Sequence, residues 1–197
     1  MDWKLLDAIK ETEHPYLNYY TLIYEVKTKD NTFKTYSYYI ASRHDKNHLL
    51  SKSNEAKPDG VLILTYLEKN GTKYAVLTKQ FRPALNRYVY SIPAGLVDDN
   101  EDVITAAKRE VSEEVGGKVE NIELLFNASP TSSGLSDELN AVCIAKVSEL
   151  EKEHLEEFED IQHLVLPFNE VESFLKDKFV ALQARSLLLY LVRAHKF

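Results

Sequence analysis

Hydrophobic and polar residues follow two different patterns along the chain, and the change comes near residue 58. In the stretch YLNYYTLIYEVKTKDNTFKTYSYYIASR, aromatic or β-branched residues alternate with polar ones on both sides of Lys29-Asp30-Asn31. Alternation around a turn sequence predicts a β-hairpin. Before it, we predict a short helical or irregular lead-in over residues 1 to about 12. The polar segment that ends at Pro58-Asp59-Gly60 is the best linker candidate, so we predict an N-terminal β element over residues 1–57 and a main domain over residues 58–197.

Beyond this linker the pattern is that of a mixed α and β domain. Short apolar runs bounded by turn residues such as Asn70-Gly71 predict strands, and longer amphipathic runs predict helices. The predicted strands are Val61–Leu67, Lys73–Phe81, Arg87–Ile92, Ile122–Ala128, Ala141–Val147 and His163–Pro167, and the predicted helices lie near Glu101–Val115, Asn169–Lys176 and Ala181–His195. The fold class that follows is α+β, with one sheet-and-helix domain after the N-terminal β element.

The predicted helix from Glu101 to Val115 carries more carboxylates than one short helix can stabilise alone. At about 100° of rotation per residue, Glu110 and Glu114 project close to the apolar ridge of the helix and not from its far side. With Glu113 they are spaced i, i+3 and i+4, so like charges are neighbours. Partly buried like charges need a counter-ion, and a row of carboxylates favours a hard cation such as Mg²⁺ over zinc.

Composition narrows the possible partners. The formal net charge of −7 argues against a general nucleic-acid or anionic-membrane binder, because both need a basic surface. A small anionic substrate must then be met locally, by arginines and metal. The longest apolar run, from Leu187 to Val192, is too short to span a bilayer, and the start of the chain has no signal-sequence pattern. The single Cys143 suits a reducing compartment, so we predict a cytoplasmic protein that binds neither nucleic acid nor membrane.

One stretch, GLVDDNEDVITAAKREVSEEVGG, carries a specific motif. From Gly95 it follows the pattern G-x5-E-x7-R-E-U-x-E-E-x-G, where U is an apolar residue, and only the final apolar position departs, being Gly117. This resembles the Nudix box, the signature of the Nudix hydrolases. The alternative, an acidic surface helix held by i,i+4 pairing with Lys108 and Arg109, leaves the glutamates on the apolar side unexplained. The resemblance implies a Nudix-type α/β/α sandwich with a mixed sheet, in addition to the small N-terminal β-hairpin element.

The resemblance also assigns roles to residues of this stretch. The groups that it assigns to divalent metal are the carboxylates of Glu110, Glu113 and Glu114 and the backbone carbonyl of Ala94. Mg²⁺ is the expected metal, with Mn²⁺ as its substitute. Arg109 and Glu101 are expected to hold the helix and its carboxylates in position, so Arg109 counts among the catalytic candidates.

The flanks of the box look like those of the ADP-ribose pyrophosphatase and nucleotide-sugar pyrophosphatase group. The resemblance rests on KQFRPA before the box, IPAGLVD at its start and SPTSSGLSDE after it. It implies that Arg82 contacts the substrate. It also implies that Glu138, in the loop after the box, is the catalytic base or completes the metal site, with Asp137 as the second candidate. Among several aromatic residues that could stack on a base, Tyr39 is one candidate.

The predicted function is Mg²⁺-dependent hydrolysis of the diphosphate linkage of a nucleoside diphosphate derivative. ADP-ribose, giving AMP and ribose 5-phosphate, is the first candidate substrate. ADP-ribose hydrolases usually carry a proline shortly before the glycine of the loop after the box, where this chain has Ser133-Gly134. A nucleoside diphosphate sugar such as an ADP- or GDP-hexose is therefore an alternative substrate. An alternative of another class is a non-catalytic Nudix-fold nucleotide sensor.

Two segments outside the box carry further expectations. The tyrosine-rich hairpin needs a partner surface, because an isolated hairpin is marginally stable, and tyrosine is enriched at interfaces. We expect a homodimer through the N-terminal β element, as the resemblance also implies. The acidic stretch ELEKEHLEEFED, residues 149–160, is expected to be a solvated charged segment and not a second metal site.

Overall fold

The structure, a computed structural model of the chain, describes residues 1–53, 55–155 and 157–194. The chain forms two compact units. The first consists of residues 1–58 and 128–140, and the second of residues 59–127 and 141–197. A loop from the second half of the chain therefore belongs to the N-terminal unit. The division into domains at residue 58 stays a prediction.

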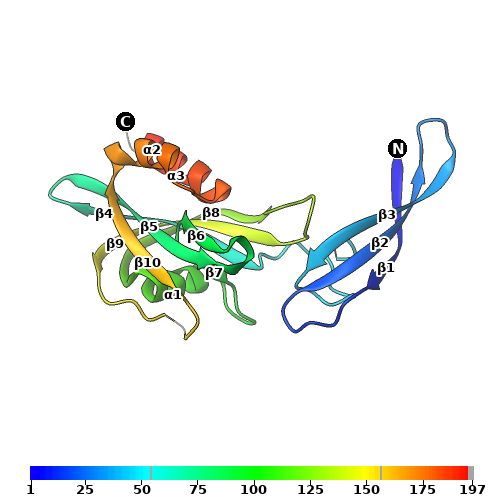
Figure 1. Cartoon of the computed structure of the whole chain (residues 1–197), viewed down its shortest axis with the longest axis horizontal. Coiled ribbons are helices and arrows are strands. Elements are labelled where there is room, and N and C mark those ends of the chain that lie inside the picture. Colours follow the sequence, from blue (N-terminus) through cyan, green and yellow to red (C-terminus); the bar gives the residue numbers. More distant parts are fainter. Residues whose placement is uncertain (54, 156, 195–197) are drawn as a thin grey trace. The chain divides into compact units, whose positions relative to one another are not determined.

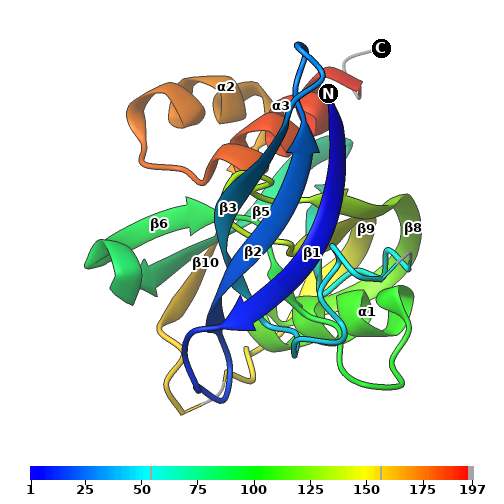
Figure 2. The ribbon, with the colours of Figure 1, turned by 90° about the vertical axis from the view of Figure 1, so that its right-hand side faces the viewer.

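The first unit is a three-stranded antiparallel sheet in the order β1 (Asp2–Lys10), β2 (Asn18–Lys27) and β3 (Phe33–Ser42), which Figure 2 shows side by side. Strands β2 and β3 confirm the predicted hairpin. The predicted helical or irregular lead-in is wrong, because it pairs with β2 as a strand. A register shift between Leu5 and Asp7 interrupts β1, and this irregularity hides the period-two alternation that would have predicted a strand.

The two faces of this sheet differ. Four core residues of this unit lie on the inner face of the sheet, and a fifth follows β3 in the chain. They are Ala8, Tyr20, Leu22 and Ile40 on the sheet and Leu49 after it. The loop of residues 128–140 joins the unit at β3, where the amide of Ala41 donates to the carbonyl of Leu135 at 2.9 Å. Since side chains alternate along a strand, Tyr19 and Tyr39 lie on the opposite face, where their rings stack with centroids 6.1 Å apart.

In the described residues, the second unit holds seven strands and three α-helices. The sheet runs in the order β10-β5-β4-β9-β8, with β6 paired to β5 and β7 paired to β4. The strands are β4 (Gly60–Lys69), β5 (Thr72–Arg82), β6 (Arg87–Ser91), β7 (Ala94–Leu96), β8 (Gly117–Pro130), β9 (Leu139–Leu150) and β10 (Ile161–Pro167). The helices are α1 (Val103–Val115), α2 (Phe168–Asp177) and α3 (Leu182–Ala194), and a 3-10 turn (Pro83–Leu85) joins β5 to β6.

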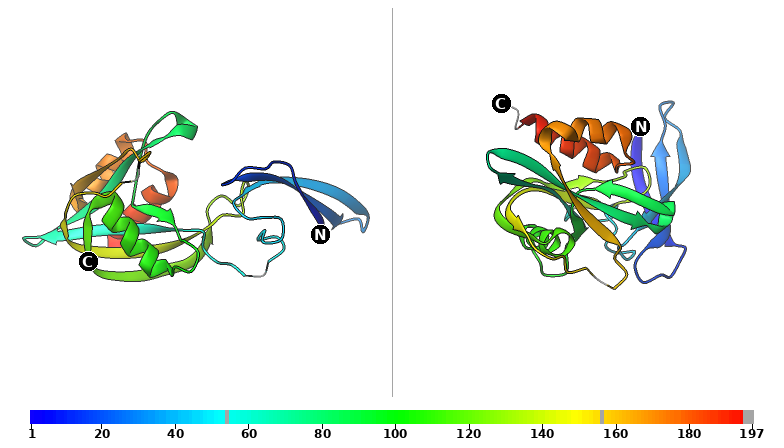
Figure 3. Two further views of the ribbon diagram at one scale, coloured as in Figure 1. Left: turned by 90° about the horizontal axis from the view of Figure 1, so that it is seen from below. Right: turned by 60° about the vertical axis from the view of Figure 1, so that its left-hand side comes forward.

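The helices cover both faces of this sheet (Figures 1 and 3). Along β4, Val61 and Ile63 pack in the cluster that includes α1, whereas Leu62 and Leu64 pack in the cluster that includes α2 and α3. A strand buried on both faces has a continuous apolar run instead of an alternating one, as β4 has. The predicted α+β class and α/β/α sandwich are confirmed.

The predicted elements of the main domain are all present, with shifted ends. The strand predicted at residues 122–128 is the C-terminal part of the longer β8, and the short β7 was not predicted because Pro93-Ala94-Gly95 has the composition of a turn. The last helix was predicted to extend to His195, which lies outside the described residues. None of the described helices is long and apolar enough to cross a membrane.

Candidate active site

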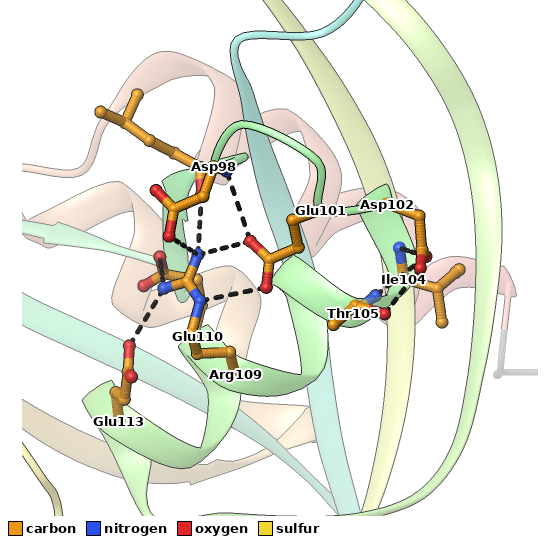
Figure 4. Close-up of polar contacts among 9 residues, drawn as sticks. Asp98, Glu101, Asp102, Ile104, Thr105, Arg109, Glu110 and Glu113 are labelled. Atoms are coloured by element: carbon orange, nitrogen blue, oxygen red, sulfur yellow. Dashed lines mark hydrogen bonds and ion pairs between the residues drawn. The ribbon is translucent and has the colours of Figure 1, made fainter.

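Helix α1 begins and ends where its sequence supplies the caps. The carboxylate of Asp102 accepts hydrogen bonds from the amides of Ile104 and Thr105 at 2.9 and 3.1 Å (Figure 4). These bonds satisfy N–H groups that have no partner inside the helix. Gly116 ends the helix with a φ of 62°, a left-handed conformation that glycine adopts without strain. The helix therefore starts after Glu101 and not at it, and it stops where the sequence predicts.

Glu110 and Glu114 are buried on the sheet side of α1, with exposed fractions of 8% and 5%. Burial raises the pKa of Glu110, and it raises the pKa of Glu114 to about 8. The charges of Glu110 and Glu159 raise the pKa of Glu114 further, while the hydrogen bond from the amide of Ala94 opposes them. The partial burial predicted from the helix geometry is confirmed, and the site concentrates negative charge that favours a cation.

Strand β7 brings its backbone against these two carboxylates. The amide of Ala94 donates to Oε2 of Glu114 at 3.0 Å. A Cβ atom at Gly95 would lie 1.8 Å from Oε1 of Glu110, far closer than two nonbonded atoms can approach. Glycine is therefore required at this position so that the carboxylate of Glu110 can lie against the backbone.

Arg109 ties the surrounding oxygens together, as Figure 4 shows. Its Nη1 donates to Glu110 at 2.6 Å and to Glu113 at 3.1 Å. Its Nε and Nη2 donate to the two oxygens of Glu101 at 3.2 and 3.0 Å, and Nη2 also donates to the carbonyl of Leu96 at 2.9 Å. The hydrogen bond with Glu101 contributes most to the raised pKa of Arg109. This two-point contact is the geometry that the predicted positioning role of Arg109 and Glu101 requires.

The oxygen donors of this site fit a hard divalent cation. Among the described residues, no three His, Cys, Asp or Glu side chains form a group that could hold a metal ion in this geometry. Arg109 holds Glu110 and Glu113, and the backbone amide of Ala94 holds Glu114. A cation would therefore replace part of the contacts of Arg109. Burial raises the pKa of Glu110 and Glu114. A bound cation would compensate the negative charge of these buried carboxylates and lower their pKa again.

Two further charged residues act on the buried glutamates. Arg82, at the end of β5, lowers the pKa of Glu114 through its positive charge. This predicted substrate-binding residue therefore faces the same site as Glu114. The negative charge of Glu159 raises the pKa of both Glu110 and Glu114. Glu159 belongs to the acidic stretch before β10 and is half-buried, whereas most of the described residues of this stretch are exposed. Its position beside the site depends on the pairing of β10 with β5, which no sequence pattern predicted.

Three predicted site residues belong to the first unit. Glu138 pairs with Arg43, with 3.5 Å between Oε1 and Nε. Asp137 accepts a hydrogen bond from the amide of Leu50 at 3.1 Å. Tyr39 is exposed on β3. The structure brings Glu138 and Asp137 into one loop of this unit, and their roles in catalysis and substrate binding stay predictions.

The departure of the motif at Gly117 has a packing cause. A Cβ atom at Gly117 would lie 2.6 Å from Cγ1 of Val111 and 3.0 Å from Cγ1 of Val147. Val111 on α1 and Val147 on β9 belong to the same core cluster, between the helix and the sheet. A larger residue at position 117 would push α1 away from β9, so glycine here preserves the packing of the helix that carries the glutamates.

Comparison with known proteins agrees with this geometry. The model of the Nudix domain matches residues 56–189. The chain is 34% identical over 125 residues to the putative nudix hydrolase 2 of Caenorhabditis elegans, covering 62% of this chain and 54% of that protein, so it spans about half the length of that relative. It is 29% identical over 131 residues to the ADP-ribose pyrophosphatase of Bacillus subtilis, covering 66% of this chain and 69% of that protein.

A solved structure shares the fold. The crystal structure of an ADP compounds hydrolase superposes with a TM-score of 0.70 at 16% identity, over 98% of this chain and 94% of that chain. Residues 56–189, which match the model of the Nudix domain, include α1, β7 and Arg109 with the glutamates that it contacts. The chain therefore belongs to the Nudix hydrolase family.

Proposed function

We propose that this chain is a divalent-metal-dependent pyrophosphohydrolase that cleaves the diphosphate linkage of a nucleoside diphosphate derivative, with ADP-ribose as the first candidate. The observation that supports this most is the buried pair Glu110 and Glu114 beside Gly95, where two carboxylates favour a cation. Two relatives, from Saccharomyces cerevisiae and Bacillus subtilis, are named ADP-ribose pyrophosphatase. The products would be AMP and ribose 5-phosphate.

Mg²⁺ is the metal that we propose, with Mn²⁺ as a substitute. The groups that would hold it are Glu110, Glu113, Glu114 and the backbone carbonyl of Ala94. When bound, the metal neutralises charge on the diphosphate and lowers the pKa of a water molecule. Arg109 donates two hydrogen bonds to Glu101, and these would keep α1 fixed if Glu110 and Glu113 held a cation instead of Arg109.

The residues of the chain bind the diphosphate and accept a proton. The guanidinium of Arg82 donates N–H groups to phosphate oxygens, for which its planar fork is suited. The oxygen of a water molecule forms a bond to one phosphorus, and the bond from that phosphorus to the bridging oxygen breaks. The water proton passes to a carboxylate. Glu138 is the base that the resemblance of the loop after the box implies, and Glu159 is the alternative because its charge acts on Glu110 and Glu114.

Release of AMP from ADP-ribose, with and without Mg²⁺, tests this proposal. We expect turnover that disappears when EDTA is added and returns when Mg²⁺ is supplied in excess. Thermal unfolding in the presence of Mg²⁺ or Mn²⁺ is measured in parallel, because a ligand that binds only the folded state raises Tm. Metal-dependent stabilisation without AMP release would refute hydrolysis of ADP-ribose and leave metal binding standing.

A nucleoside diphosphate sugar is the second candidate substrate. The relatives include the ADP-sugar pyrophosphatase of Mus musculus and the GDP-mannose pyrophosphatase of Pectobacterium atrosepticum, and Ser133 departs from the ADP-ribose pattern. Comparison of kcat/KM for ADP-ribose, ADP-glucose and GDP-mannose separates the candidates. A kcat/KM for either sugar at least about tenfold above that for ADP-ribose would transfer the assignment.

A non-catalytic nucleotide sensor is the alternative of another class. One relative, from Bacillus methanolicus, is named methanol dehydrogenase activator. Retention of every carboxylate of the Nudix box favours hydrolysis. Stabilisation by ADP-ribose without turnover of any of the three diphosphates would instead favour the sensor.

We also propose that the N-terminal β element forms a homodimer. Tyr19 and Tyr39 are 44% and 54% exposed on the outer face of the first unit, and tyrosine is favoured at interfaces because it combines a flat apolar ring with a polar tip. Sedimentation should show a dimer that Tyr19→Lys and Tyr39→Lys convert to monomer. Tyr190→Lys, at an equally exposed position on α3, should leave the dimer intact. A wild-type protein that is monomeric at all concentrations would contradict this.

A further inference from the structure

Two arginines lie opposite each other at the end of the hairpin formed by β5 and β6. Arg82 is the last residue of β5 and Arg87 is the first residue of β6, and the antiparallel register pairs them directly. Side chains of directly paired residues point to the same face, with their Cβ atoms roughly 5 Å apart. Like charges at this spacing repel each other, so a pair of arginines here is unfavourable unless an anion joins it.

The face that carries this pair is the face covered by α1. Along β5, Val76 packs in the cluster that includes α1, and Arg82 shares its side because side chains alternate along a strand. Arg87, directly opposite Arg82, lies on the same side. The charge of Arg82 also lowers the pKa of Glu114 on α1. Both arginines therefore lie on the side of the sheet that holds the buried glutamates.

Neither arginine of this pair has an acidic partner. The other arginines of the chain each donate to an oxygen, namely Arg43 to Glu138, Arg109 to Glu101, Arg185 to the carbonyl of Lys178 and Arg193 to Glu172. Within the part of the chain that the structure describes, Arg82 and Arg87 form no ion pair and donate no side-chain hydrogen bond. Because the chain has an excess of acids and a net charge of −7, two neighbouring arginines without an acid point to an anion from solution.

The hairpin holds the two arginines in place. The 3-10 turn between them closes with the amide of Asn86 donating to the carbonyl of Pro83 at 3.1 Å. The guanidinium of Arg87 lies over the ring of Phe179, 5.5 Å from its centroid. This contact uses the face of the guanidinium and leaves the N–H groups in its plane able to donate. The donors are therefore positioned before any ligand binds, which lowers the entropic cost of binding.

We propose that Arg82 and Arg87 together bind the diphosphate of the substrate, one arginine to each phosphoryl group, so that Arg87 selects diphosphates over monophosphates. This inference rests on the proposed function, which already gives Arg82 a phosphate contact. Each phosphoryl group of a diphosphate diester carries a negative charge, and the planar fork of a guanidinium donates two N–H groups to such oxygens. Each product keeps one phosphoryl group and one arginine contact, which favours its release.

Inorganic pyrophosphate and inorganic phosphate test the arginine pair without turnover. Calorimetry in metal-free buffer measures both affinities, so the result does not depend on a bound cation. We expect pyrophosphate to bind at least about tenfold more tightly than phosphate. Arg87→Gln should reduce this difference to less than about threefold, and a thermal melt should show an intact fold because Arg87 is exposed.

Lys79→Gln is the matched control for charge. Lys79 lies on the same strand but on the opposite face, where its Nζ is 4.6 Å from the centroid of the Tyr88 ring. The variant removes the same charge from β5 and β6 as Arg87→Gln does, yet it should leave the preference for pyrophosphate intact. A general attraction of anions by net charge would instead make the two variants alike.

Turnover gives a second measurement. Arg87→Gln should raise KM for ADP-ribose at least about tenfold while kcat stays within about threefold, which is the pattern of a lost contact that substrate and transition state share. Lys79→Gln should leave both constants unchanged. An increase in KM without a loss of pyrophosphate affinity would assign Arg87 to another part of the substrate and overturn the proposal.

The remaining outcomes separate this proposal from the proposed function. If the wild-type protein hydrolyses no diphosphate, the proposed function fails, whereas pyrophosphate binding that depends on Arg87 still supports the arginine pair. Hydrolysis with an unchanged KM in Arg87→Gln overturns the arginine pair and leaves the function standing. Equal affinity of the wild-type protein for pyrophosphate and phosphate, or no binding of either, also overturns the pair.

Discussion

The predicted site carboxylates of the two units differ in the range of their contacts along the chain, and of those in the first unit only Glu138 also has a short-range contact, with the Thr131 hydroxyl at 2.7 Å. In the second unit, Glu114 meets a backbone amide 20 residues away, and Arg109 meets Glu101 at a separation of 8 residues. In the first unit, Arg43 meets Glu138 at a separation of 95 residues, and Asp137 meets Leu50 at 87. Contacts of short range appear as fixed spacings in the sequence, whereas contacts of long range appear only in the fold.

The largest expected effect tests the short-range site. Glu114→Gln should lower kcat at least about a hundredfold, or ~2.7 kcal/mol of barrier, while the fold persists. Glutamine can still accept from the amide of Ala94, and a neutral side chain suits a position where burial raises the pKa of the glutamate to about 8. The measurement is AMP release together with a thermal melt. Glu123→Gln, exposed on β8, is the control, and more than about a tenth of wild-type kcat in Glu114→Gln would contradict the role of Glu114.

A smaller loss is expected when the backbone contact of the same site is blocked. Gly95→Ala places a methyl group where the carboxylate of Glu110 now lies, so kcat should fall at least about tenfold and the unfolding free energy by about 1–3 kcal/mol. Chemical denaturation and AMP release measure the two quantities. Gly134→Ala is the control for stability in the first unit, because its Cβ would find Tyr38 Oη at 4.0 Å. Equal destabilisation by both alanines would contradict the packing argument.

Loss of the helix cap should affect stability and not chemistry. Asp102→Ala removes the acceptor of two amides at the start of α1, and we expect Tm to fall by roughly 2–4 °C. Hydrogen bonds, first of all that from the Thr105 side chain, hold the pKa of Asp102 below 3.8. The stabilisation is therefore present above pH 3.8 and is lost as pH falls through the lowered pKa. Melts at pH 7 and at about pH 2 check this, with the exposed Asp99→Ala as a control.

The smallest effect is expected for a single long-range contact of the first unit. The hydroxyl of Tyr38 donates to the carbonyl of Gly134 at 3.0 Å, a separation of 96 residues in sequence. Because this bond is exposed, Tyr38→Phe should lower the unfolding free energy by only about 0.5 kcal/mol. Denaturant titration measures it against Tyr36→Phe, whose ring contacts do not involve the hydroxyl. A loss in Tyr38→Phe as large as that of Gly95→Ala would erase the contrast between the two units.

Most of the second unit could be predicted from the sequence because its signals are local. The apolar run of β4, the caps of α1 and the burial of Glu110 and Glu114 all follow from residue type and periodicity. Sequence reasoning missed Glu159 because its place depends on a strand pairing between β10 and β5. The composition of its segment, rich in charge, is equally typical of a solvated loop.

The first unit was predicted less completely, for the same physical reason. The hairpin of β2 and β3 has a local turn and regular alternation, and it was predicted. Strand β1 has an irregularity between Leu5 and Asp7, so its period is broken. The attachment of residues 128–140 to this unit has no signal in the sequence, because it depends on where β8 and β9 deliver their connecting loop.

The composition of the first unit from two separate segments has a consequence for synthesis. Residues 1–58 leave the ribosome before the segment of residues 128–140 that completes their contacts. At 5–20 residues per second the delay until residue 140 is roughly 4–16 s, long compared with the microseconds in which a hairpin forms. During that interval the sheet exposes an incomplete aromatic core and an unpaired strand edge, the kind of surface at which nascent chains associate with one another.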